Sequence, residues 1–275
     1  MTSAAVTTRN AYIKHIRKNV RALFPVFKEK DQHLGDVTEK LTLQFNNDLQ
    51  VRLQSIGISV LPAGVLETSA SGVIAYCVGK SVNQLRWFRL ANRRFIVKGR
   101  FGTQTSTFHA SGNVIRTSPY HHITPEAVGS VLERFRGQFL QDIPPPYVSD
   151  ADTESPPRVP VASMKRNVIC YSIVCTELNL PDFSLEIDSG PGFSPRVLVH
   201  DLGQGLSSCA CVTSMEQTQQ GPFTLKHALP SYSWSWEEAS AASEKLFDLW
   251  YPCIAQIRKE MEHKRELFEG HARYF

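Results

Sequence analysis

Positively charged and aromatic side chains are interleaved between residues 85 and 101, and a surface that combines them could bind an anion. If Ala91-Asn92 forms a two-residue turn, the flanking strands pair as a hairpin, and residues facing each other across it share one side. One side then holds Phe88 opposite Phe95 and belongs to the core. The other side carries the residues expected to contact an anionic partner: Trp87, Arg89, Arg94, Lys98 and Arg100.

The chemistry of that second side is charge recognition. Arg89 and Arg94 would be directly opposed and would repel each other unless an anion lay between them, and Trp87 would offer a stacking surface beside them. Phosphate groups or an acidic protein patch would fit. A basic edge that only discourages strand pairing explains the same residues, so both interpretations stay open.

Histidines and cysteines are the next candidates, as metal ligands. Cys209 and Cys211 would point to one side of a strand, and four histidines are available: His109, His121, His122 and His200. No recognised ligand spacing connects them, so we expect no metal site and no cofactor. Buried cysteines and a turn with two histidines are the simpler interpretation.

The tripeptide Asp188-Ser189-Gly190 follows an apolar stretch and locally resembles the Asp-Ser/Thr-Gly loop of aspartic proteases. That resemblance implies a second carboxylate that shares a proton with the first. The sequence contains no second loop of this kind, so two chains would each have to contribute one. Pro191-Gly192 makes a plain turn the simpler interpretation.

Signature motifs of common enzyme classes are missing from the sequence. It contains no Gly-x-x-x-x-Gly-Lys phosphate loop, no Gly-x-Ser-x-Gly and no His-Glu-x-x-His. We therefore predict no catalytic residue and lean against an enzyme. An enzyme without a recognisable motif stays an alternative, because catalytic groups can be assembled from distant positions.

The elements that would position these residues begin with a basic amphipathic helix from Thr8 to Phe24, ended or kinked by Pro25. A period of two then predicts a hairpin over 41–53 and an antiparallel meander. Its further strands are expected at 56–61, 72–78, 84–90, 93–101 and 105–109. Thr124-Pro125-Glu126 predicts the start of a helix that closes this half of the chain.

A second half with the same order of elements is expected after a Pro-rich linker at residues 144–163. Its strands are predicted at 167–176, 183–187, 196–200, 206–214 and 223–227. The clearest element is the C-terminal helix, because Ser235 and Glu238 have capping-box spacing and an apolar stripe follows. Pro252 should kink it. The predicted domains are therefore 1–143 and 164–275.

The composition sets the broad class. The 275 residues, 42% of them apolar, can bury a substantial core. Residues 1–145 hold 19 Lys and Arg against 9 Asp and Glu, or +10, and the remainder holds 11 against 17, or −6, which together give the net +4. The spacing of the six cysteines favours reduced thiols and a cytoplasmic location. Mitochondrial targeting by the first helix is the alternative.

The sequence therefore predicts an α+β fold of two antiparallel β-sheets, each followed by a covering helix, with a long kinked C-terminal helix. We expect a non-catalytic binding or assembly protein that engages an anionic partner through the basic aromatic hairpin. A partner protein or self-association is expected. RNA or DNA binding through the N-terminal half is the alternative.

Overall fold

The computed structural model describes residues 26–29, 60–144 apart from 65, 68 and 69, 165–230, and 241–259 apart from 244 and 247. The helix predicted over 8–24 and the hairpin predicted over 41–53 lie outside the described residues. So does the predicted linker, apart from Pro144, and the domain boundary there stays a prediction.

Two compact units divide the chain, and each is built from segments that are distant in sequence. Unit 1 comprises residues 1–66, 72–91 and 220–275, and unit 2 comprises residues 67–71 and 92–219. The helices and strands of each unit are described separately below.

Unit 2 is built on antiparallel strand pairs. In spatial order its strands are β10 (Ala210–Gln220), β4 (Arg93–Phe101), β9 (Asp182–Ser189), β8 (Lys165–Asn179) and β7 (Gly137–Asp142). In β4, Phe95 and Val97 are buried while Arg94 and Lys98 are exposed, because successive side chains point to opposite faces. The strand predicted over 93–101 is confirmed.

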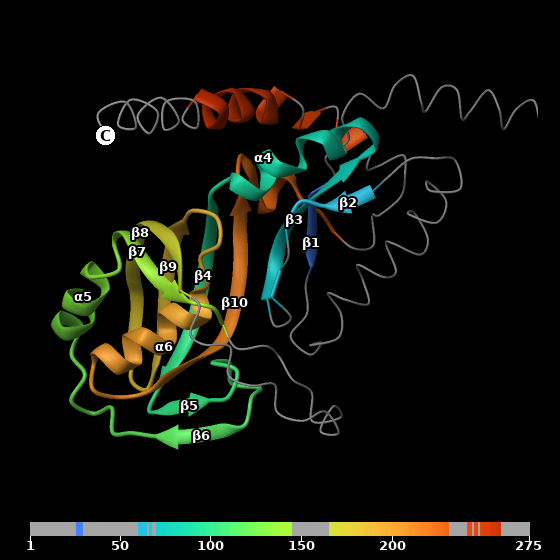
Figure 1. Ribbon diagram of the computed structural model, residues 1–275. Helices are drawn as coiled ribbons and strands as arrows, with labels where there is room; N and C mark the ends of the chain where they lie inside the picture. The colour runs from blue at the N-terminus through green and yellow to red at the C-terminus, as the bar shows by residue number, and fades with distance from the viewer. Residues whose placement is uncertain are drawn as a thin grey trace, which may run out of the picture. The chain divides into compact units, whose positions relative to one another are not determined.

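Two helices of unit 2 pack beside the sheet: α5 (Pro125–Glu133) and α6 (Pro195–Gly205) (Figure 1). The predicted start of α5 is confirmed, because the Thr124 hydroxyl accepts the Ala127 N–H at 3.3 Å as an N-cap. The two helices touch closely at Gly205, where an added Cβ would lie 2.8 Å from a methyl carbon of Val131. A larger residue there would push α5 and α6 apart.

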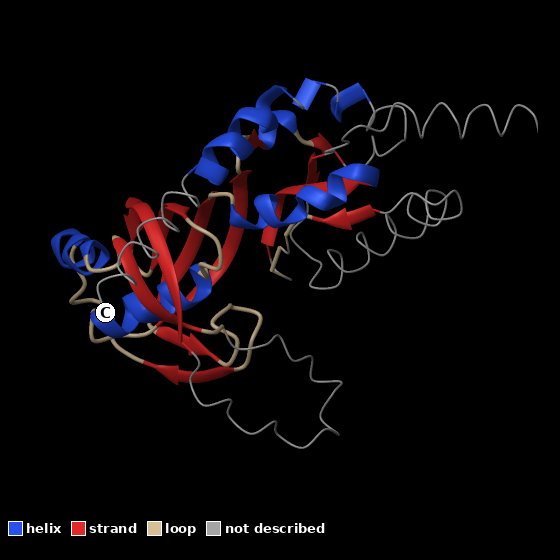
Figure 2. Ribbon diagram, turned by 45° about the horizontal axis from the view of Figure 1, so that its top comes forward, coloured by secondary structure: helices blue, strands red, loops and turns tan. Residues whose placement is uncertain are grey.

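A small hairpin stands apart from the main sheet of unit 2, formed by β5 (Thr103–Thr105) and β6 (Val114–Thr117) (Figure 2). The loop between them is held by its own side chains, since the Thr105 hydroxyl donates to the His109 carbonyl at 2.7 Å. Phe108 in this loop has a φ of 61°, the left-handed region that costs a non-glycine residue about 1–3 kcal/mol. The backbone therefore holds Phe108 in an unfavourable conformation.

Unit 1 pairs β3 (Ala70–Val78) with β1 (Val26–Glu29) and β2 (Val60–Pro62), both antiparallel, and β1 with β12 (Leu229–Pro230) in parallel. The first two residues of β3 belong to unit 2. Short elements complete the unit: β11 (Phe223–Thr224), α4 (Leu85–Leu90) and the 3₁₀ helices Gly79–Gln84 and Leu225–His227. The described residues among 241–259 are helical and confirm the predicted C-terminal helix.

The core of unit 1 is centred on Trp250, which is fully buried. Its ring stacks on Phe88 with 3.5 Å between centroids, and Phe223 packs against both rings. The Trp250 indole N–H donates to the Gln84 side-chain oxygen at 3.0 Å, which satisfies its polar atom inside the core.

Two predicted strands are helices, and those predictions are wrong. Residues 85–90 form α4, because Phe88 must reach Trp250, so the expected hairpin across Ala91-Asn92 does not exist. Residues 196–200 lie in α6, where Pro195 occupies the first turn and burial outweighs the β propensity of Val197 and Val199. The predicted mixture of antiparallel strands and helices holds. The description as two sheets, each followed by a covering helix, is consistent with the structure only in part, because the chain has a mixed α/β fold with a large sheet.

Candidate active site

The carboxylate of Glu67 is the centre of a hydrogen-bonded cluster in unit 2. Its side chain is 24% exposed. One carboxylate oxygen accepts the Nε–H of Arg196, and the other accepts the Ser194 hydroxyl at 3.3 Å. The Glu67 carbonyl accepts the Ala70 N–H at 2.8 Å, so a turn presents this residue immediately before β3. The carboxylate is therefore held in place and still reachable from solvent.

Arg196 is the fixed member of the pair. Its side chain is only 4% exposed, and its Nη1 donates to the Thr107 carbonyl at 2.5 Å while Nε donates to Glu67. A guanidinium is rarely buried without such partners, because removing its charge from water is costly. Arg196 thus ties Glu67 to the β5–β6 loop from the first turn of α6.

Gln141 of β7 anchors the start of α6. Its side-chain nitrogen donates to the Ser194 carbonyl at 3.0 Å, and its side-chain oxygen accepts the Ser194 N–H at 2.8 Å. The pair reproduces the two hydrogen bonds of a backbone ladder. Gln141 is 1% exposed, so water does not compete for these bonds. These two bonds therefore hold the backbone of Ser194, whose hydroxyl donates to the Glu67 carboxylate.

His109 of the β5–β6 loop is a buried, neutral neighbour of this cluster. Burial and the nearby positive charge of Arg196 lower the pKa of His109 to about 4. Its Nδ1 accepts the Ser111 N–H at 3.1 Å, which leaves the proton of the neutral ring on the other nitrogen. The adjacent Phe108 ring stacks on His200 of α6, with 3.9 Å between centroids. The loop is thereby joined to α6 on a second side.

A second arginine, Arg166 of β8, is within electrostatic range of Glu67. Burial lowers the pKa of the Arg166 guanidinium, and the negative charge of Glu67 raises it. Its Nε is buried and has no hydrogen-bond partner. Within the part of the chain that the structure describes, Arg166 forms no ion pair. The cluster thus combines one carboxylate with two guanidinium groups, and of these two only Arg196 forms an ion pair with Glu67.

The residues expected to bind an anion fall into both units. Trp87 and Arg89 lie on α4 in unit 1, where the Trp87 ring is covered by the guanidinium groups of Arg86 at 4.2 Å and Arg258 at 5.1 Å. Arg94, Lys98 and Arg100 share the exposed face of β4 in unit 2.

Two of those β4 cations have carboxylate partners within the sheet. Arg94 pairs with Asp188, and Arg100 pairs with Asp182, each at 2.8 Å. Asp188 of the protease-like tripeptide is thus an ion-pair partner at the end of β9. The anion-binding role of the five predicted residues stays a prediction.

The described residues contain no group of three His, Cys, Asp or Glu side chains that could hold a metal ion. The described cysteines are free thiols, and burial raises the pKa of Cys77 to about 12 and that of Cys170 to about 11. These two thiols are therefore protonated and poor nucleophiles at neutral pH. No helix in the described segments is long and apolar enough to cross a membrane.

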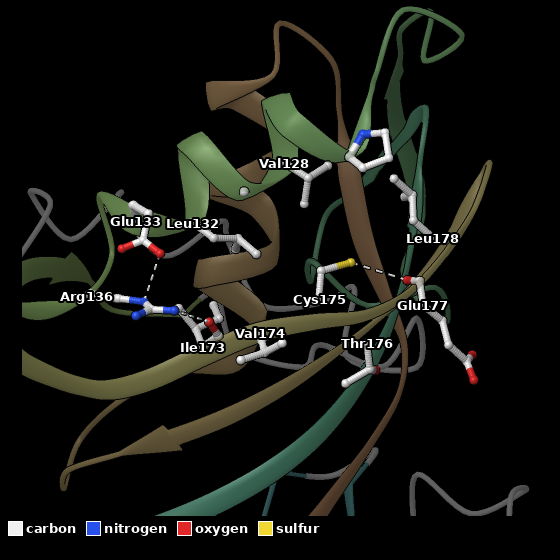
Figure 3. A pocket seen from close by; sticks show the side chains of 12 residues that line it. Val128, Leu132, Glu133, Arg136, Ile173, Val174, Cys175, Thr176, Glu177 and Leu178 are labelled. Atoms are coloured by element: carbon white, nitrogen blue, oxygen red, sulfur yellow. Dashed lines mark hydrogen bonds and ion pairs between the residues drawn. The ribbon is translucent and has the colours of Figure 1, made fainter.

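A pocket of about 290 Å³ opens between α5 and β8 in unit 2 (Figure 3). Its charged residues include Glu133 and Arg136, which pair with each other at 3.2 Å. Burial raises the pKa of the Cys175 thiol in its wall, so this sulfur is a weak nucleophile. Glu67 does not line this pocket. The pocket is therefore a poorer candidate for catalysis than the Glu67 cluster.

The prediction from sequence missed every member of the Glu67 cluster except His109, which it weighed only as a metal ligand. One available signal was Ser194-Pro195, an N-cap type followed by proline, which marks a helix start. The other was Glu67, a lone acid between apolar and small residues.

Comparison with known proteins finds a family model that matches part of this chain. Residues 59–194 match the family model described as TruB family pseudouridylate synthase (N terminal domain). That span includes Glu67, Gln141, Arg166 and Ser194, and it ends two positions before Arg196.

Among curated proteins, the chain is 32% identical over 210 residues to pseudouridylate synthase TRUB1 of Mus musculus, covering 74% of this chain and 60% of that one. It is 26% identical over 271 residues to tRNA pseudouridine synthase B of Francisella tularensis subsp. novicida, covering 93% of this chain and 86% of that one. The chain thus spans about 60% of the mouse relative's length.

Solved structures share the fold. A chain of a Cbf5-Nop10-Gar1 complex superposes with a TM-score of 0.57 at 15% identity, covering 84% of this chain and 61% of that one. A chain of an H/ACA RNP bound to a substrate RNA containing 2'-deoxyuridine superposes with a TM-score of 0.55 at 14% identity, covering 80% and 53%.

These findings overturn the predicted function. The matching family and relatives are named as enzymes that make pseudouridine, so the expectation of a non-catalytic binding or assembly protein, and the lean against an enzyme, are wrong. The emphasis on protein binding over nucleic acid is corrected for the same reason. The Glu67 cluster joins residues from separate segments, so no single sequence motif contains it.

Proposed function

We propose that this protein is a pseudouridine synthase that isomerises uridine in RNA, with Glu67 as the reacting carboxylate. The observation that carries the proposal is the geometry of Glu67, which is partly exposed and held by the buried Arg196 within the segment similar to the TruB family. The names of the relatives, which include a tRNA pseudouridine synthase, support RNA as the substrate class.

Pseudouridine formation requires one bond exchange and no redox step. The C1′–N1 bond of uridine breaks, the base turns, and a C1′–C5 bond forms. N1 gains a proton, and C5 loses one. Cleavage of a glycosidic bond develops positive charge at the sugar carbon, which a nearby carboxylate can stabilise or attack. A carboxylate can also accept the C5 proton. Glu67 can supply each of these functions.

The other cluster residues position this group. Arg196 and Ser194 fix the two carboxylate oxygens, so little reorganisation is needed when charge develops on the substrate. Gln141 fixes Ser194, and the β5–β6 loop fixes Arg196 through the Thr107 carbonyl. Such support from packed elements is what a reaction needs for precise orientation.

The direct test is nucleoside analysis of RNA after incubation with the purified protein. Wild-type protein should convert uridine to pseudouridine, and Glu67→Gln should reduce the rate by at least about a hundredfold. Glu186→Gln is the matched control, because Glu186 is an exposed carboxylate on β9. Equal rates for wild type and Glu67→Gln would overturn the assignment of Glu67. Failure of the wild type on all cellular RNA would overturn the proposed activity.

A further inference from the structure

The second arginine of the cluster has no role in holding Glu67. Arg166 lies in β8 directly across from Gln141 of β7, so its side chain leaves the sheet beside the residue that anchors Ser194. Its Cδ lies 3.9 Å from the position that a Cβ would take on Gly192, one turn before α6. Three elements, β7, β8 and the 190–194 turn, therefore surround this side chain.

The Arg166 guanidinium is only partly satisfied by the protein. Its Nε is buried with no hydrogen-bond partner, while the comparable buried group of Arg196 has both Glu67 and the Thr107 carbonyl. An unpaired donor on a charged group costs stability, and native proteins usually pair such groups with a side chain, water or ligand. Glu67 lies close enough to act on the charge of Arg166, but its carboxylate oxygens are bonded to Arg196 and Ser194.

We propose that Arg166 binds a phosphate of the RNA backbone next to the target uridine and thereby sets the position of the ribose over Glu67. A phosphodiester has one negative charge and two free oxygens, which match the planar fork of a guanidinium. It would balance the positive charge of Arg166 through the outer guanidinium nitrogens, because Nε itself is buried. This proposal rests on the proposed function, because it names how the same site holds its substrate.

A phosphate-binding role makes a specific kinetic prediction. Arg166→Gln should weaken RNA binding about tenfold or more and raise KM, with kcat reduced less than KM is raised. The slope of log affinity against log salt should become less steep by about one, since one phosphate contact is lost. Arg166→Lys should restore part of the affinity, because the charge returns without the fork.

A neutral phosphate provides the sharper test. The RNA substrate is synthesised with a methylphosphonate on either side of the target uridine in turn, and binding is measured by fluorescence anisotropy. One of the two replacements should weaken binding of the wild type about tenfold and leave Arg166→Gln unchanged, because the partner of that phosphate is already missing. Lys165→Gln is the control, since Lys165 neighbours Arg166 and is exposed. This variant should respond to the methylphosphonate as the wild type does.

The outcomes separate this inference from the proposed function. Equal losses in wild type and Arg166→Gln at both positions would overturn the role of Arg166, even if pseudouridine is formed. If pseudouridine is never formed, oligouridylate replaces the defined substrate. If Arg166→Gln then bound oligouridylate with the affinity and the salt dependence of wild type, the phosphate-binding role of Arg166 would be overturned. Circular dichroism and a thermal transition matching wild type show that the Arg166→Gln protein is folded.

Discussion

The Nε of Arg196 donates to the carboxylate of Glu67 across 129 positions of sequence, and this contact joins the first turn of α6 to the turn that precedes β3. Both residues belong to unit 2. One partner is almost completely buried and the other is partly exposed, so the pair has a fixed end and an accessible end. That asymmetry is what a reacting carboxylate requires.

Removal of the buried partner should destabilise the protein. Arg196→Met leaves the Glu67 carboxylate and the Thr107 carbonyl without their donor, and we expect a loss of about 3 kcal/mol in the free energy of unfolding. Urea denaturation at pH 7 measures it. Arg94→Met is the matched control, because the Arg94 side chain is 59% exposed and its pair with Asp188 should be worth under about 1 kcal/mol. Equal losses of stability in the two variants would contradict the stabilising role of the buried Arg196.

The aromatic core of unit 1 should be equally sensitive. Trp250→Ala removes the ring stacked on Phe88 and should cost about 3–5 kcal/mol. Tyr251→Ala, the next residue along the same helix, is 65% exposed and should change the free energy of unfolding by less than about 1 kcal/mol. Thermal unfolding of the two variants compares them directly. A small effect of Trp250→Ala would show that this helix does not pack on α4.

Acid should destabilise the fold through His109. Its pKa is about 4 in the folded protein and about 6.5 when unfolded, so between these values only the unfolded chain takes up the proton. The contribution of neutral His109 is complete above pH 6.5 and is lost as the pH falls toward 4. Between pH 7 and pH 5 wild type should lose about 2 kcal/mol relative to His109→Asn. If the free energy of unfolding changed equally in wild type and His109→Asn between the two pH values, this would be evidence against a buried neutral histidine.

The contribution of Asp201 to stability should change with pH in the opposite direction to that of His109. Burial and the nearby Asp142 raise the pKa of Asp201 to about 6, so ionising this carboxyl group in the folded protein at higher pH costs stability. Asp201→Asn should therefore be more stable than wild type at pH 7, by about 2 kcal/mol, and the gain should shrink as the pH falls toward 4. Urea denaturation of both proteins across this range tests it. A destabilised Asp201→Asn at pH 7 would mean that the carboxylate makes a favourable charged contact.

Local patterns predicted much of the scaffold. The alternation of residues 93–101 and the Thr124 N-cap gave β4 and the start of α5 correctly, because each depends on neighbours in sequence. Residues 85–90 and 196–200 were assigned wrongly because tertiary burial decides their state. Phe88 is buried against the Trp250 ring, and most side chains of α6 are buried.

The site could not be predicted from sequence for a related reason. Glu67, Gln141, Arg166 and Arg196 come from separate elements, and each looks ordinary in its own segment. The basic residues of β4 looked more informative, yet Arg94 and Arg100 are paired with carboxylates of the neighbouring strand. The positions of charged residues in a sequence do not reveal which of them form ion pairs in the folded protein.

The most direct test of the central claim follows the proton that leaves C5. RNA transcribed with uridine tritiated at C5 is incubated with excess protein, and tritium released to water is measured over time in a single turnover. We predict release by wild type and by Glu186→Gln, and at least about a hundredfold slower release by Glu67→Gln. Release by Glu67→Gln at the wild-type rate would contradict the account of Glu67 as the reacting carboxylate.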